Sequence, residues 1–274
     1  MLTFFRSNKH YLWLVLFLFT ISPFVVALFD QRPKDTCGNE KFDPSLGYLK
    51  STDQILAYAD KEYKGGSLLS LEDTVSYVAH ITDIYKRRFC HGELNYRFSE
   101  NWIAWVAGKL FWSHFSSMVL TKDVVKYSKC LCNQQTLAYM EALIQKGIDV
   151  RTVGLGYKVP GHFLCEVWYG GAWHLYDISI EPNWDRIEHP HRDLEYYLKD
   201  KDMFYKIYEG RIQRSLFDKI MEQQVYGERN NLPGKKMKFF QAFTEVLTYI
   251  MPIGFLVLFL GSYRKRKIQR VFEI

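Results

Sequence analysis

Two long runs of apolar residues stand near the ends of the chain, and each has the length of a membrane-spanning helix. Tyr11 to Phe29 gives 19 consecutive residues without a formal charge, and Val246 to Tyr263 gives another 18. A helix needs roughly 20 apolar residues to cross the hydrocarbon core of a bilayer. Both runs have basic flanks, which favours membrane spans over buried core helices. We expect a membrane anchor in residues 1–30, a second membrane helix at 238–263 and a basic tail at 264–274.

The first run also has the features of a cleavable signal peptide. Arg6 and Lys9 would form its basic n-region, and Val25-Val26-Ala27 is an acceptable cleavage site. We favour a retained anchor, and both readings give the same topology. Basic residues collect on the cytoplasmic side of membranes, so these residues and Arg264–Lys267 place both termini in the cytoplasm. We therefore expect residues 31–237 to form an extracytoplasmic domain, on the periplasmic side of a bacterial inner membrane.

The middle of the chain changes from a helical period to a strand-like one near residue 150. Apolar spacing and end signals predict helices at Ser70–Arg88 and Leu131–Lys146, and Trp102–Phe115 is a helical candidate whose rings we expect in the core. Residues rich in Val, Trp, Tyr and Phe then predict three strands, at Val150–Tyr157, His162–Tyr169 and Ala172–Ile178. Residues 192–224 return to a helical pattern. This order indicates an α+β fold.

The formal net charge of +6 comes from the flanks of the two apolar runs. Between Asp30 and Met237 there are 28 Lys and Arg against 28 Asp and Glu, so this part is neutral. A nucleic-acid binder usually carries its basic excess on the folded domain, so we expect no nucleic-acid partner. His189 and His191 flank Pro190, but no second cluster has zinc spacing, and no Gly-rich phosphate loop is present. We expect no metal, no cofactor, and both histidines at the surface.

The cysteine count is odd, which matters outside the cytoplasm. The five cysteines are Cys37, Cys90, Cys130, Cys132 and Cys165. In an oxidising compartment an odd number leaves at least one thiol unbridged or joined to another chain. Cys37 and Cys90 are the structural pair we expect, since both lie outside the region of the candidate motifs. A catalytic thiol is one reason to leave a cysteine unbridged.

Cys132 stands at the start of the predicted helix that ends near Gly147. Backbone N–H groups and the helix dipole favour negative charge at that end, and therefore favour a thiolate, the nucleophilic form of cysteine. The same N–H groups can stabilise the oxyanion that forms when a carbonyl is attacked. Cys132 is therefore a candidate nucleophile, although a cysteine taken alone is more often an inert core residue.

The Gly170-Gly171 pair predicts a two-residue hairpin turn in which Tyr169 pairs with Ala172. Counting back along both strands places His162 and Asp177 on the same face as diagonal cross-strand neighbours. A carboxylate there can hold the proton on one ring nitrogen of His162, which leaves the other nitrogen for a nucleophile. A slip of one residue would put Asp177 on the other face, so the prediction depends on this turn.

Several short motifs follow one another between Cys132 and Asp177. Between those two residues stand Gly147-Ile148-Asp149-Val150-Arg151, Gly161-His162-Phe163-Leu164-Cys165-Glu166-Val167 and Gly170-Gly171-Ala172-Trp173. Their order resembles the core of the transglutaminase-like superfamily of papain-like cysteine enzymes. There, a helix opens with the Cys and ends in Gly-Ile-x-x-Arg. A His-led strand with a downstream Glu follows, and a Gly-Gly-x-Trp hairpin leads to the Asp. The resemblance covers about residues 68–180 and implies a nucleophile helix packed on an antiparallel sheet.

The resemblance implies that Cys132 is the nucleophile, His162 the general base and acid, and Asp177 the carboxylate that orients His162. The sequence departs from the usual pattern at three positions. Cys130 stands where glycine is frequent, Thr136 where a smaller residue is common, and Ile178 where proline is frequent. Cys130 leaves two alternatives open, because it could replace Cys132 as the nucleophile or form a disulfide, for instance with Cys165.

The resemblance also implies acyl transfer through a thioester, either hydrolysis of an amide or peptide bond or transfer of the acyl group to an amine. A protein or peptide is then the expected substrate. One alternative is a transglutaminase-like scaffold or binding subunit of a membrane complex, which would tolerate loss of the three residues. Another is biosynthetic acyl transfer onto a small molecule or a lipid-linked substrate, which a membrane anchor would suit.

Overall fold

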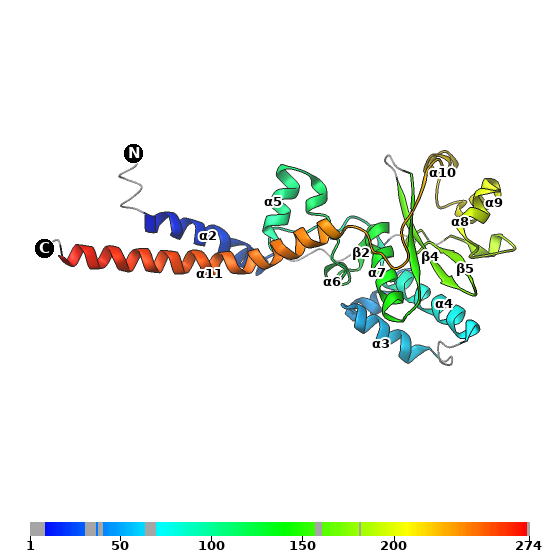
Figure 1. Ribbon diagram of the computed structural model, residues 1–274, viewed down its shortest axis with the longest axis horizontal. Coiled ribbons are helices and arrows are strands. Elements are labelled where there is room, and N and C mark those ends of the chain that lie inside the picture. Colours follow the sequence, from blue (N-terminus) through cyan, green and yellow to red (C-terminus); the bar gives the residue numbers. More distant parts are fainter. Residues whose placement is uncertain are drawn as a thin grey trace. The chain divides into compact units, whose positions relative to one another are not determined.

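The chain forms two compact units (Figure 1). The computed structural model describes residues 9–30, 37, 41–63, 70–156, 161–180 and 182–272. The unit that we call the sheet unit comprises residues 35–94 and 119–235. The unit that we call the apolar-helix unit comprises residues 1–34, 95–118 and 236–274. Helices and small sheets together give an α+β architecture, as predicted.

A four-stranded antiparallel sheet lies at the centre of the sheet unit. Its strand order is β5-β4-β3-β6, with β3 at Val150–Leu155, β4 at His162–Tyr169, β5 at Ala172–Tyr176 and β6 at Gln224–Tyr226. The three predicted strands are present, although β5 ends before Ile178 and Tyr157 lies outside the described residues. The short strand β6 begins at the last residue of the range predicted as helical, and it pairs with β3.

The hairpin between β4 and β5 has the predicted register. Tyr169 pairs with Ala172, and the pairing continues to Cys165 opposite Tyr176. Gly170 and Gly171 have φ values of 60° and 78°, a left-handed conformation that suits the two central residues of a type I′ turn. The register that places His162 and Asp177 on one face is therefore confirmed.

Helices cover both faces of this sheet. The longer ones are α3 at Thr52–Glu62, α4 at Leu71–Arg88 and α7 at Cys132–Gln145. The remaining short helices of the sheet unit are η1 at Pro44–Tyr48, α6 at Thr121–Val124, η3 at Trp184–Arg186, α8 at Leu194–Leu198, α9 at Lys201–Tyr208 and α10 at Arg214–Ile220. Tyr139 of α7 contacts Tyr176 on one face. Leu164 and Leu175 point to the other face, into a buried cluster formed with α8, α9 and α10.

A disulfide joins the beginning of the sheet unit to its smaller sheet. Cys37 and Cys90 are bonded, with Cα atoms 5.9 Å apart, which confirms the predicted pair. Cys90 belongs to β1 at Cys90–His91, and β1 runs parallel to β2 at Lys129–Cys130. The strand β2 ends two residues before α7 begins, so this sheet leads directly to the start of that helix.

The apolar-helix unit contains two helices that are long and apolar enough to cross a membrane, by length and composition. They are α2 at Lys9–Ala27 and α11 at Lys235–Phe272. The helix α11 continues beyond the predicted membrane segment, so the predicted basic tail is helical as far as Phe272. Only 17% of each apolar stretch is buried within the protein.

Residues 95–118 lie within the range 31–237 that the sequence assigns to one domain, yet they cluster with the two apolar helices. This segment contains α5 at Trp102–Leu110 and η2 at Ser113–Phe115. The single helix predicted for Trp102–Phe115 is therefore interrupted. Its end is exposed rather than packed in a core, since Phe111 retains 81% of its accessible surface.

Candidate functional site

Cys132 is the first residue of α7, and side-chain hydrogen bonds fasten the chain at this helix end. The side-chain oxygen of Gln134 accepts a hydrogen bond from the N–H of Leu131 at 2.9 Å. Its amide nitrogen donates to the carbonyl of Leu94 at 2.8 Å. Gln134 thus closes the first turn and ties it to the segment that follows β1. The N–H groups of the first turn have no intrahelical acceptors, as is usual at a helix start.

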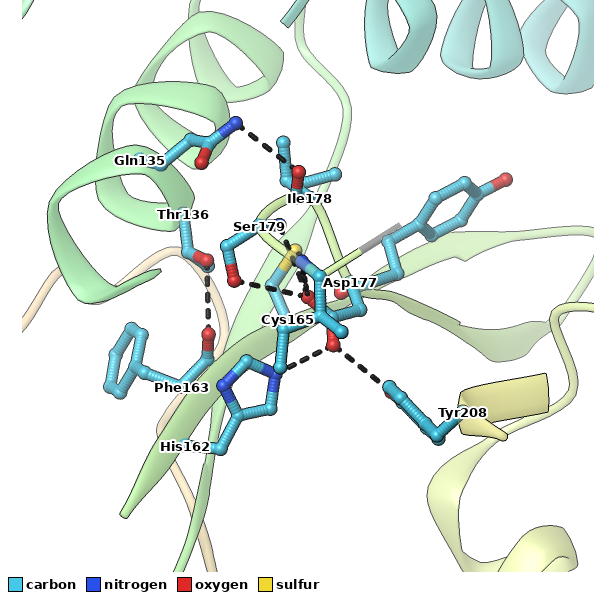
Figure 2. A network of polar contacts seen from close by, with 11 residues as sticks. Gln135, Thr136, His162, Phe163, Cys165, Asp177, Ile178, Ser179 and Tyr208 are labelled. Carbon is cyan, nitrogen blue, oxygen red and sulfur yellow. Dashed lines mark hydrogen bonds and ion pairs between the residues drawn. The ribbon is translucent and has the colours of Figure 1, made fainter. Parts of the chain in front are cut away.

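The next two residues of α7 attach the helix to the sheet (Figure 2). Gln135 donates from its side-chain amide to the carbonyl of Ile178 at 3.2 Å. The hydroxyl of Thr136 donates to the carbonyl of Phe163, also at 3.2 Å. Thr136 is one of the three departures from the family pattern, and here its hydroxyl has a specific partner. These bonds fix the start of α7 beside both strands that carry the other candidate residues.

His162 and Asp177 meet as predicted from the hairpin register. Nε2 of His162 lies 2.6 Å from Oδ2 of Asp177 (Figure 2). His162 opens β4, and Asp177 directly follows β5. Both side chains are buried, with 8% and 1% of their residue surfaces exposed. The short distance and the burial leave Nδ1 as the ring nitrogen available to another partner.

The carboxylate of Asp177 is held by donors on both oxygens. Oδ1 accepts from the N–H and hydroxyl of Ser179, at 3.1 Å and 3.3 Å, and from the N–H of Ile180 at 3.2 Å. Oδ2 accepts from the hydroxyl of Tyr208 at 3.0 Å, besides its contact with His162. The turn formed by the Oδ1 contacts explains why β5 ends before Ile178: the chain bends back toward the Asp177 side chain.

The electrostatics of the pair favour an ionised carboxylate and a protonated imidazole. Burial alone lowers the pKa of His162, but the negative charge and hydrogen bond of Asp177, with a further hydrogen bond from Cys132, raise it to about 10. Burial alone raises the pKa of Asp177, but the charge and hydrogen bond of His162 and the other donors lower it below its ordinary value. The pair therefore carries opposite charges across the neutral range.

Cys132 is the cysteine that shares a surface with this pair. Its thiol lies close enough to His162 to contribute to the raised pKa of that imidazole. Cys132 is half-buried, and it lines a cavity of about 690 Å³ together with His162. The other lining residues are His91, Gly161, Ser179, Ile180, Arg211, Ile212, Gln213, Leu216 and Ile220. Cys132 and His162 thus share an open cavity, and the buried Asp177 is bonded to His162 without lining that cavity.

Cys130 and Cys165 are thiols, so the disulfide that the sequence left open between them does not form. Both are fully buried, and neither lines the cavity. Burial, followed by the nearby negative charges of Asp177 and Glu166, raises the pKa of Cys165 well above its ordinary value. Cys130 belongs to β2, whose end precedes the helix. Geometry therefore favours Cys132 over Cys130 as a nucleophile that a substrate can reach.

A pair of opposite charges, Arg151 and Glu166, joins strands of the sheet, and neither residue lines the cavity. Nε of Arg151 lies 2.6 Å from Oε2 of Glu166, which is fully buried. Oε1 of the same carboxylate accepts the N–H of Leu194 at the start of α8 at 2.7 Å. The guanidinium of Arg151 lies between the rings of Trp173 and Tyr226, at 4.5 Å and 4.7 Å. This cluster joins β3, β4, β5 and β6 to α8.

Tyr208 is a residue of the candidate site that the sequence did not reveal. It lies at the end of α9, within a helical stretch whose role could not be assigned, and only 1% of it is exposed. No motif or spacing distinguishes it from the other tyrosines of that stretch. In the fold its hydroxyl donates to the carboxylate that orients His162. Tyr208 therefore has the position of a residue that fixes the candidate triad from outside the recognised motifs.

Replacing Tyr208 by Phe should lower the free energy of unfolding by about 1.5 kcal/mol at neutral pH, because a buried carboxylate loses one donor. The lowered pKa of Asp177 means that this stabilisation is present above pH 3.8 and is lost as pH falls through the folded-state value. The difference between the variant and the wild type should therefore shrink in acid. Chemical denaturation of both full-length proteins at a series of pH values measures this difference in the free energy of unfolding.

Tyr205→Phe is the matched control for this prediction. Tyr205 lies on the same helix, but its hydroxyl donates to the backbone carbonyl of Ile212 at 3.1 Å, a group that does not titrate. Its effect on stability should not depend on pH in the acid range. A Tyr208→Phe effect that is equally independent of pH would contradict the role assigned to its bond with Asp177.

The two histidines expected at the surface differ from one another. His189 is exposed, whereas His191 is half-buried and its ring stacks on Tyr176 at 4.3 Å. Burial lowers the pKa of His191 to about 4, and its Nδ1 lies 2.9 Å from the carbonyl of Leu175. It therefore packs the chain after η3 against β5. Within the described part of the chain, no group of three or more His, Cys, Asp or Glu side chains is placed to hold a metal ion.

No family model, no curated protein and no solved structure matches this chain.

Proposed function

We propose that this chain is a membrane-anchored cysteine enzyme of the transglutaminase-like kind. The observation that carries the proposal is the buried His162–Asp177 pair, with His162 and the half-exposed Cys132 lining the same open cavity. A nucleophile, a base and a group that orients the base are the parts that nucleophilic catalysis requires. A purely structural site would not require a half-exposed thiol beside a buried histidine–carboxylate pair.

In the first half of the proposed reaction, the thiolate of Cys132 attacks the carbonyl carbon of an amide or peptide bond. The negative charge on the carbonyl oxygen is stabilised by N–H groups of the first turn of α7. The imidazolium of His162 then gives its Nδ1 proton to the leaving nitrogen. The C–N bond breaks, the amine departs, and the acyl group remains on Cys132 as a thioester.

In the second half, water or a second amine attacks the thioester carbonyl. Nδ1 of His162, now without its proton, takes a proton from the attacking group as general base. The C–S bond breaks, the thiolate of Cys132 returns, and the product is a carboxylic acid or a new amide. Asp177 stays ionised throughout: its bond to Nε2 keeps the ring oriented and stabilises its protonated form.

The two apolar helices support the membrane part of the proposal. By length and composition either helix could cross a bilayer. With the basic flanks in the cytoplasm, the site would lie outside it, on the periplasmic side of a bacterial inner membrane. The disulfide between Cys37 and Cys90 supports an oxidising compartment. A protein or peptide is the proposed acyl donor, and partners in a membrane complex fit the anchored topology.

Cys132→Ala should abolish covalent labelling of the protein by an electrophilic thiol probe. The reason is that Cys132 is the half-exposed thiol beside His162, whereas Cys130 and Cys165 are buried. The measurement is labelling of full-length protein in native membranes, followed by mass spectrometry of the modified peptide. Near-complete loss of label is expected.

Cys130→Ala is the matched control, since it removes a neighbouring thiol from the end of β2 and keeps Cys132. Labelling should persist in this variant. If labelling persisted in Cys132→Ala and were lost in Cys130→Ala, the reactive thiol would be Cys130. Persistence in both variants would refute the proposed site.

A further inference from the structure

The cavity beside Cys132 has one apolar wall. Four aliphatic residues line it, namely Ile180, Ile212, Leu216 and Ile220. The last two belong to α10, and Ile180 is held by its backbone bond to Asp177. A volume of about 690 Å³ falls in the range of pockets that take small ligands or a few residues of a chain. The cavity therefore suits a short segment with an aliphatic side chain.

Among the described residues, one arginine lines the same cavity. Arg211 lies in the turn between α9 and α10, where its N–H donates to the carbonyl of Tyr208 at 2.9 Å. The neighbouring arginines Arg186 and Arg214 pair with carboxylates of their own. Within the described part of the chain, no ion pair engages the exposed guanidinium of Arg211. A guanidinium of this kind at a ligand cavity is suited to bind a carboxylate.

We propose that the cavity takes a short peptide or peptide-like acyl donor that has an aliphatic side chain and a carboxylate bound by Arg211. This inference rests on the proposed function, because it assumes that Cys132 is the acyl acceptor. The apolar wall would hold the side chain, Arg211 the carboxylate, and Cys132 and His162 would face the carbonyl that reacts. An open cavity of this size accepts a flexible peptide segment more readily than it accepts the surface of a folded protein.

The test compares iodoacetate with iodoacetamide on the full-length protein, because the reagents alkylate the same thiol and differ in one negative charge. Arg211→Gln should lower the iodoacetate rate relative to the iodoacetamide rate about two- to fivefold, the range of a partly exposed ion pair. Arg192→Gln is the matched control: Arg192 is exposed, lies outside the cavity lining, and should leave the ratio unchanged.

The apolar wall is tested by an N-alkyl iodoacetamide, whose advantage over iodoacetamide should fall in Leu216→Ser. Unchanged ratios in both Arg211→Gln and Leu216→Ser, with Cys132 still alkylated, would overturn the inference and leave the proposed nucleophile intact. Failure of every reagent to modify Cys132 would overturn both. The two failures are therefore distinguishable.

A separate observation concerns the apolar-helix unit. Its segment 95–118 is fastened to the helices that could cross a membrane. The side chain of Asn101 donates to the hydroxyl of Thr244 at 2.9 Å, and that of Gln241 donates to the carbonyl of Ser117 at 2.6 Å. The ring of Trp102 meets that of Phe19 edge-on at 5.3 Å. Since Phe19 lies within α2, the start of α5 is adjacent to a candidate span.

The far end of α5 exposes a continuous run of large apolar side chains. Leu110, Phe111 and Trp112 retain 71%, 81% and 53% of their accessible surfaces. Lys109 precedes them, with its ammonium group 5.9 Å from the ring of Trp105. Tryptophan, other apolar residues and a lysine that can extend toward water are the composition of segments that rest at a membrane surface.

We propose that residues 109–112 insert into the lipid interface as a third membrane contact, beside the two apolar helices. The ring of Trp112 contacts that of Phe115, which in turn contacts Phe240 of α11. The occupant of this apolar surface is lipid rather than a protein partner, because the surface adjoins a helix whose own apolar stretch is mostly exposed. Insertion would hold the segment 95–118 at the membrane surface and limit rotation of the apolar-helix unit about its helix axes.

A polarity-sensitive fluorophore attached at Phe111→Cys, in full-length Cys132→Ser protein in lipid nanodiscs, tests this contact. Nitroxide-bearing lipids should quench it strongly, and aqueous iodide should quench it weakly. Val225→Cys is the matched control, because Val225 is an apolar residue with 60% exposure in the sheet unit. A fluorophore at this position should be quenched strongly by iodide and weakly by nitroxide-bearing lipids. Equal iodide quenching at the two positions would overturn the proposal.

Discussion

Asp177→Asn should reduce the rate of Cys132 acylation by about 10⁴-fold, the size of effect that the same change has in a triad. The side chain keeps its shape, so the donors to Oδ1 and the packing around the hairpin can persist. An amide lacks the charge that stabilises the imidazolium of His162. Its NH₂ group would also donate to Nε2 and place the ring proton on Nδ1, where it no longer accepts a proton from Cys132.

The measurement is the single-turnover rate with an activated peptide ester, which reports formation of the thioester directly. Asp185→Asn is a control of the same chemistry at an exposed position in η3, and its rate should stay within twofold, roughly the spread of a neutral surface substitution. A loss of only a few-fold in Asp177→Asn, with His162 still folded in place, would show that the carboxylate does not orient a catalytic base.

Glu166→Ala should destabilise the protein by about 3 kcal/mol, because it leaves the partly buried positive charge of Arg151 without its partner. The expected value lies at the low end for such pairs since the Arg151 side chain keeps 22% exposure. The N–H of Leu194 also loses its acceptor. Thermal or chemical unfolding of the full-length protein measures the loss, and thiol labelling of Cys132 in the folded variant reports whether the site survives.

Two further variants complete this test. Arg151→Met combined with Glu166→Leu removes both charges and should recover much of the loss, since apolar replacements of a buried pair are often nearly neutral. Glu195→Gln, an exposed glutamate on α8, should change stability by less than about 0.5 kcal/mol. A single Glu166→Ala variant as stable as this control would contradict the structural role of the ion pair.

The part of the site that could be predicted from the sequence follows from local rules. A Gly-Gly pair fixes a two-residue turn, the turn fixes the register, and the register decides which residues share a face. His162 and Asp177 are separated by 15 positions, and these few rules suffice to bring them together. The position of α7 could be predicted in the same way, because its apolar period and the glycine after its last turn limit where the helix can lie.

What could not be predicted depends on contacts distant in sequence. Tyr208 reaches Asp177 across 31 positions, and nothing in a helical run of tyrosines shows which one turns inward. The segment 95–118 has the aromatic composition of a core helix, and the fold places it beside α2 and α11. Its polar anchors, Asn101 and Gln241, are 140 positions apart, and no local pattern signals their contact. Long-range pairing of this kind is a property of the packed chain.

Both the short strand β6 and Tyr208 would be lost if the chain were cut directly after the last motif of the family resemblance. A fragment that stops near residue 180 contains Cys132, His162 and Asp177, and it covers the whole region of family resemblance. It would nevertheless leave β3 as an open sheet edge and expose the apolar face formed by Leu164 and Leu175. The minimal autonomous domain therefore extends at least through Tyr226, well past the last motif that a sequence search for the triad would recognise.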